Sequence, residues 1–180
     1  KIPVDVRALG ADLLSLSAHK FNGPKGAGAL WIRRGTRLAP LLTGGKHERT
    51  RRAGTENVPG IAGLGVAARL ALAKLPSEPA RIGVLRDRLE AAILASVRGT
   101  AVNGAPDRRV PNTTNISFEA VEAESLLIAL DLEGVAVSTG SACSSGTLEP
   151  SHVLKAMGLP SPRTQNSIRF SLGAGNTEAD

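Results

Sequence analysis

The alternation of short apolar runs with longer segments of helical periodicity most constrains the fold of this chain. Residues 12–17 (DLLSLS) and 29–32 (ALWI) are typical of strands, and a loop rich in Gly and Pro separates them. Residues 59–75 repeat apolar side chains at helical spacing, and Pro59 stands where helices often begin. Such alternation predicts an α/β fold.

A break at residues 75–79 (LPSEP) divides the chain. Ser77 is expected to cap a following helix that ends before Gly99 and whose apolar face holds Ile82, Leu85, Leu89 and Ile93. We therefore predict two domains, residues 1–74 and 75–180. In the second we expect strands at 115–118, 135–137 and 167–172, a helix from Ala123 that stops at Gly134, and a short helix between Pro150 and Gly158.

Composition restricts the class of protein. The chain has 180 residues, 42% hydrophobic and 21% charged, as folded domains do. No apolar run approaches the ~18 residues of a membrane span, so we expect no membrane association. A single cysteine excludes an internal disulfide and favours a reducing compartment, by default the cytoplasm. The net charge is +6, yet the basic residues outside residues 46–52 are scattered, and no aromatic residues interleave with them. This pattern argues against nucleic acid as a partner and favours small anionic ligands.

Three groups of residues could carry chemistry. Ser17, His19 and Lys20 follow a predicted strand, where they could bind a phosphate and form a Schiff base with an aldehyde cofactor, although a lysine at such a place is more often a surface charge. Cys143 lies in a loop of small residues, which favours a reactive thiol over a buried apolar one. Arg169 lies in an apolar strand and suits a carboxylate, although an arginine in such a strand more commonly faces solvent.

Together these segments resemble the cysteine desulfurases of the NifS/IscS group, in the class V aminotransferase family. The resemblance rests on SAHKFNGPKGAGALWIRR at 17–34, GGKHERTRRAGTENVPGI at 44–61, and STGSACSSGTLEPSHVLKAMGL followed by NSIRFSLG at 138–159 and 166–173. It implies the fold of pyridoxal-phosphate-dependent transferases of fold type I, which are similar to aspartate aminotransferase. Residues 1–74 would then belong to the cofactor-binding large domain, and residues 75–180 would be most of the small C-terminal domain.

The resemblance also implies a role for each candidate residue. Lys20 would carry pyridoxal 5'-phosphate, Ser17 and His19 would contact its phosphate, and Thr55 would reach the phosphate of the partner subunit of a homodimer. Arg169 would hold the carboxylate of L-cysteine, whose sulfur would pass to Cys143 as a persulfide. The sulfur would then go to an iron-sulfur scaffold or another acceptor protein, and alanine would be the other product. No metal is implied.

Members of the group are roughly twice as long as this chain, and their N-terminal halves supply contacts to the cofactor ring. We therefore expect the chain to be a C-terminal part that is inactive alone. Two other functions stay open. A selenocysteine lyase or another class V aminotransferase would keep the Lys20 segment, although Cys143 favours desulfuration. A non-enzymatic chain could instead bind a partner through residues 46–52.

Overall fold

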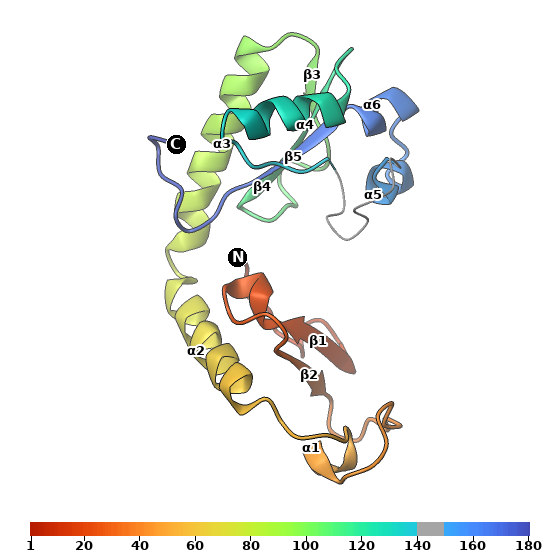
Figure 1. The fold of residues 1–180 in the computed structure, drawn as a ribbon. Helices are drawn as coiled ribbons and strands as arrows, with labels where there is room; N and C mark the ends of the chain where they lie inside the picture. Colours follow the sequence, from red (N-terminus) through yellow and green to blue (C-terminus); the bar gives the residue numbers. More distant parts are fainter. Residues whose placement is uncertain (140–149) are drawn as a thin grey trace. The chain divides into compact units, whose positions relative to one another are not determined.

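The computed structural model describes residues 1–139 and 150–180. Its contacts divide the chain into two compact units, Pro3–Pro76 and Ser77–Asp180, the latter with Lys1–Ile2 (Figure 1). The division lies between Pro76 and Ser77.

The first unit contains two strands and two α-helices. Its elements in chain order are β1 (Leu13–Ser17), the short 3-10 helix η1 (Ala18–Phe21), β2 (Gly28–Ile32), α1 (His47–Thr50) and α2 (Val58–Lys74). β1 and β2 pair antiparallel, with Ser17 opposite Gly28. Leu13 and Leu30 are 43% and 47% exposed, so this small sheet carries uncovered apolar side chains.

Local sequence fixes the start of α2. The side chain of Asn57 accepts a hydrogen bond from the Gly60 N–H at 3.1 Å, and Pro59 lies in the first turn, where a missing N–H costs nothing. The helix then packs against η1 through Ala67, which is buried. α2 therefore supports the turn that follows β1.

The second unit is a three-stranded antiparallel sheet with helices. Its elements are α3 (Glu78–Ser96), β3 (Thr100–Val102), β4 (Thr113–Phe118), α4 (Ala123–Leu132), α5 (His152–Ala156), α6 (Ser161–Gln165) and β5 (Ser167–Ser171). The strand order is β3-β4-β5. Alternate residues of β4 and β5 form the core, because Ile116, Phe118, Ile168 and Phe170 are all buried. Leu89 and Ile93 of α3 and three leucines of α4 pack on this face, as Figure 1 shows for the two helices.

Two expectations for this unit were wrong. Residues 135–137 form no strand, and the chain there joins the sheet only through a bridge between Ser138 and Arg169. Ser77 precedes α3 as expected, but its side chain makes no capping hydrogen bond. Its ψ of −39° already lies in the helical region, whereas a capping residue usually has extended backbone.

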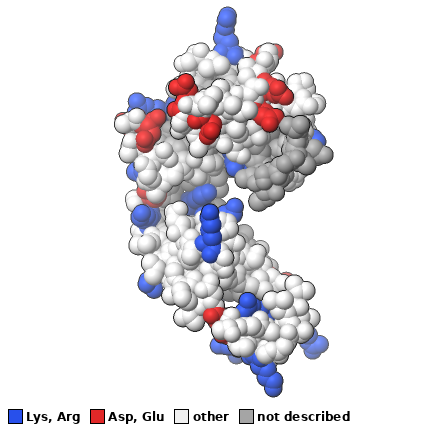
Figure 2. Space-filling view, viewed as in Figure 1, with Lys and Arg blue, Asp and Glu red and all other residues white. Residues whose placement is uncertain are grey.

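Helix length and surface charge bear on possible partners. In the part of the chain that the structure describes, no single helix is long and apolar enough to cross a membrane; α2 and α3 reach that length and composition only when counted together across a bend. Figure 2 shows Lys and Arg side chains spread over the visible face, with several close to one another around the α1 region.

Candidate active site

The turn after β1 holds three of the predicted site residues. Ser17 ends β1, and the chain turns at once into η1, which contains His19 and Lys20. Ala18 between them is fully buried, and its N–H donates to the carbonyl oxygen of Ala27 at 3.0 Å. The Gly23 N–H returns to the Ala18 carbonyl at 2.9 Å, which closes the turn. Buried Ala18 therefore anchors a turn whose polar side chains face outward.

Close packing beneath this turn leaves no room for a larger residue at Gly23. A Cβ atom there would lie 2.8 Å from the Cβ of Ala18 and 3.1 Å from that of Ala67. Asn22, just before it, has a left-handed backbone with φ of 66°. The sequence FNGPKG thus provides a tight return from η1 that keeps α2 in contact with the turn.

Ser17, His19 and Lys20 are all exposed. Among the described residues, none of their side chains has a hydrogen bond or an ion pair. One short turn therefore presents a hydroxyl, an imidazole and an amine together, all available to a ligand. This is the combination that the sequence predicts for a phosphate-bearing aldehyde.

Thr55 lies in the same unit, in the loop before α2. It is exposed, and it follows Gly54, whose φ of 101° favours glycine. Arg52 holds this stretch of backbone, because its Nη1 donates to the carbonyl oxygens of Gly54 and Thr55 at 3.0 and 3.3 Å. The Thr55 hydroxyl has no hydrogen bond to another described residue.

Arg169 belongs to the other unit, on the central part of β5. Its neighbours Ile168 and Phe170 point into the core, so its own side chain lies on the opposite face of the sheet. Its backbone N–H donates to the Ser138 carbonyl at 2.6 Å, and the Ser138 N–H donates back at 3.2 Å. The Nε of Arg169 is buried and has no hydrogen-bond partner among the described residues. A buried, unpaired guanidinium nitrogen is what an anionic ligand would satisfy.

Cys143 lies outside the described residues. The structure therefore groups Ser17, His19 and Lys20, places Thr55 in the same unit, and places Arg169 in the other unit. Sequence reasoning missed the polar residues beside Arg169, chiefly Asn115. The signal was present, since Asn115 and Ser117 alternate with apolar residues along β4.

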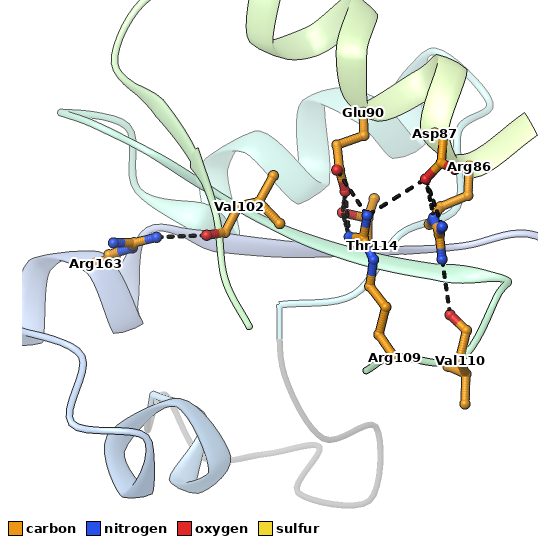
Figure 3. A network of polar contacts seen from close by, with 8 residues as sticks. All are labelled: Arg86, Asp87, Glu90, Val102, Arg109, Val110, Thr114 and Arg163. Carbon is orange, nitrogen blue, oxygen red and sulfur yellow. Dashed lines mark hydrogen bonds and ion pairs between the residues drawn. The ribbon is translucent and has the colours of Figure 1, made fainter. Parts of the chain in front are cut away.

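A separate polar cluster joins α3 to the loop before β4 (Figure 3). Glu90 accepts hydrogen bonds from Arg109 at 2.5 and 2.9 Å and one from the hydroxyl of Thr114. The hydrogen bond from Arg109 is the main cause that lowers the pKa of Glu90, against an opposing effect of burial. Nearby, Arg86 donates to Asp87 and to the carbonyl oxygen of Val110. This cluster contains no predicted site residue.

The second unit also contains a cavity. A cavity of about 400 Å³ lies beside β3 and the start of α6, and its lining includes Ser117, Glu119 and Arg163 but none of the predicted site residues. No group of three or more His, Cys, Asp or Glu side chains suited to a metal occurs within residues 1–139 and 150–180.

Comparison with known proteins identifies the family. The family model described as aminotransferase class V matches residues 1–180. A cysteine desulfurase of Gluconacetobacter diazotrophicus is 53% identical over all of this chain, which covers 45% of that protein. A solved NifS-like protein superposes with a TM-score of 0.88 at 36% identity, covering 99% of this chain and 46% of that one. A second structure, titled SspA in complex with cysteine, superposes with a TM-score of 0.72 at 35% identity. The match covers 96% of this chain and 47% of that one.

The chain spans about half the length of the relatives that it matches. The family match nevertheless covers every residue, including the Lys20 turn and the strand of Arg169. This polypeptide belongs to the class V aminotransferase family.

Proposed function

We propose that the protein to which this chain belongs is a cysteine desulfurase that uses pyridoxal 5'-phosphate and converts L-cysteine to L-alanine. The observation that carries the proposal is the anchored turn that presents Ser17, His19 and Lys20 together. The names of the relatives support the reaction, and the SspA structure supports the substrate, since its title names bound cysteine.

The donor set of the turn fits the cofactor. Lys20 would hold the aldehyde carbon through its Nζ, while Ser17 and His19 would donate hydrogen bonds to phosphate oxygens. All three side chains are exposed and make no hydrogen bond or ion pair to other described residues, so no internal contact must break first. When bound, the cofactor ring supplies an electron sink for negative charge at the substrate α-carbon. In a homodimer, Thr55 would add a contact to the phosphate in the partner subunit.

The remaining steps belong to side chains of this chain. Arg169 binds the substrate carboxylate with its planar guanidinium, which orients the α-carbon. The amine of Lys20 would take the α-proton and later return a proton. The Cys143 thiolate attacks the substrate sulfur, so that an S–S bond forms on Cys143 while the C–S bond of cysteine breaks. One thiol and one cysteine thus give one persulfide and one alanine.

The persulfide would pass to an acceptor protein, such as an iron-sulfur scaffold. The single cysteine of the chain is consistent with a reducing compartment such as the cytoplasm, which keeps the thiol available between cycles.

The complete protein tests this proposal through two variants. Reduction with borohydride should fix the cofactor on Lys20, as peptide mass mapping would show, and Lys20→Ala should bind no cofactor covalently. Cys143→Ser should still bind cofactor and cysteine but form no persulfide and release little alanine. Capture of the cofactor on Lys25, or unchanged sulfide release from Cys143→Ser, would refute the assigned roles.

A further inference from the structure

The face of the small sheet that carries Arg169 is polar. Antiparallel partners place their side chains on the same face, and the partners here are Asn115 with Arg169 and Ser117 with Ser167. The other face of the same strands forms the apolar core. Arg169 therefore lies among amide and hydroxyl groups that could themselves bond to it.

Asn115 is the closest of these neighbours across the strands. Both backbone groups of Arg169 bond to Ser138, on the edge away from β4. Asn115 likewise turns its carbonyl oxygen to β3, where it accepts from the Asn103 N–H at 2.8 Å. Asn115 and Arg169 are thus a non-hydrogen-bonded pair, the type in which facing side chains approach most closely.

The side-chain oxygen of Asn115 nevertheless accepts a hydrogen bond from a residue other than Arg169. The Nδ2 of Asn103, a residue only 8% exposed, donates to Asn115 Oδ1 at 2.6 Å and to the hydroxyl of Ser167 at 2.9 Å. Arg163 in turn donates from Nε to Asn103 Oδ1 at 2.7 Å. Because this hydrogen bond holds the oxygen end of the Asn103 amide, the NH₂ end faces Asn115.

Arg163 is itself held in place at both ends. Its Nη2 donates to the Val102 carbonyl at 2.7 Å, as Figure 3 shows, and its own carbonyl accepts from the Ser167 hydroxyl at 2.5 Å. The orientation of the Asn103 amide is therefore set by groups on β3, α6 and β5. Its hydrogen bond draws the Asn115 oxygen toward Asn103, and Arg169 keeps a buried Nε without a partner among the described residues.

We propose that Asn103 and Arg163 are positioning residues that hold the Asn115 amide so that its oxygen does not pair with Arg169. The guanidinium thereby stays free for the carboxylate of an incoming amino acid. This inference rests on the proposed function of Arg169 and deepens it. If Asn103 is removed, the Asn115 oxygen loses its donor, turns to Arg169 and competes with substrate.

Kinetics of the complete enzyme give the first test. Asn103→Ala should raise the KM for L-cysteine by roughly tenfold with little change in kcat, because a hydrogen bond to a charged group now opposes binding. The double variant Asn103→Ala/Asn115→Ala should return the KM to that of Asn115→Ala alone, since the competing oxygen is gone. A matched control, Ser171→Ala on the same face, should change the KM by less than about twofold.

A merely structural role for Asn103 predicts the opposite pattern. The double variant would then be at least as impaired as Asn103→Ala, and that outcome would overturn the inference.

Unfolding of the cofactor-free protein gives a second test that needs no turnover. Asn115→Asp places an acceptor beside Arg169 that cannot turn its oxygens away, so its effect on stability should depend on Arg169. The cycle of Asn115→Asp, Arg169→Met and their combination should be non-additive in urea unfolding. Additive effects would refute the pairing of residues 115 and 169. An unchanged KM in Arg169→Met would refute the carboxylate role of Arg169 instead, which separates the two failures.

Discussion

The pair of Glu90 and Arg109 gives a prediction whose size follows from its contacts. Replacing Glu90 by Gln keeps one acceptor oxygen but turns an amide donor toward the donors of Arg109. Hydrogen bonds to charged groups contribute about 1.5–3 kcal/mol each, and breaking a fully buried ion pair costs about 3–5 kcal/mol. The Glu90 and Arg109 side chains are 15% and 16% exposed, and Asp87 stays 3.6 Å from Arg109. We therefore expect a loss of about 2 kcal/mol.

Amide hydrogen exchange of β4 in the complete protein measures this loss locally. Because Thr114 of β4 also bonds to Glu90, weakening the pair should favour opening of the strand. A loss of about 2 kcal/mol in opening free energy speeds exchange roughly thirtyfold. The control is Glu124→Gln, the same chemical change at an exposed position of α4, which should leave exchange unaltered. Unchanged exchange of β4 in Glu90→Gln would show that the pair does not hold the strand.

The same pair predicts a dependence on pH with a definite sign. The pKa of Glu90 in the folded protein lies below its ordinary value of 4.5, chiefly because Arg109 donates to the carboxylate. The stabilisation is therefore complete above the unfolded pKa and disappears as the pH falls through the lower folded pKa. Glu90→Gln has no such carboxylate. As the pH drops below 4.5, the protection of β4 amides against exchange should consequently fall less in Glu90→Gln than in the natural protein.

Three further predictions concern the proposed site. Arg169→Ala should raise the KM for L-cysteine by roughly tenfold or more, through loss of about 1.5–3 kcal/mol, and an unaltered KM would refute the carboxylate role of Arg169. Gly23→Ala should destabilise the protein by about 1–3 kcal/mol and reduce the absorbance of bound cofactor, because the new Cβ would clash with Ala18. The control Gly65→Ala on α2 should be tolerated, because a Cβ there meets no other atom. Residues 1–180 produced alone, with cofactor and L-cysteine added, should yield no alanine, because the resemblance assigns the ring contacts to other residues; repeated turnovers would contradict this.

Helices of strong periodicity were the most predictable part of the fold. The helix expected at residues 59–75 is α2, displaced by one residue at each end, because proline and apolar spacing are local signals. The strand expected at residues 135–137 is absent, because an apolar run does not show which residue pairs with a neighbouring strand; here only Ser138, the next residue, bridges to β5. β3 was missed because three residues, Thr100–Val102, are too few to display a period.

The candidate site was predictable to a similar degree and for similar reasons. Ser17, His19 and Lys20 share one turn because they are sequence neighbours, so their grouping required no tertiary information. The network of Asn103 and Arg163 was not predictable, since these residues are 60 positions apart and meet only when the sheet forms. The roles of Thr55 and Arg169 stay predictions from the resemblance.

The bridge between Ser138 and Arg169 also limits the distance between Arg169 and Cys143, the residue that we propose as the sulfur acceptor. Cys143 is five residues beyond Ser138 in the chain, and an extended chain advances about 3.3–3.6 Å per residue. The Cα of Cys143 can therefore lie no more than about 18 Å from the Cα of Ser138, whose backbone is hydrogen-bonded to that of Arg169. Lengthening this stretch by a few residues would enlarge the accessible volume as the cube of the radius. The proposed sulfur acceptor would then be tied less closely to the residue proposed to bind the substrate.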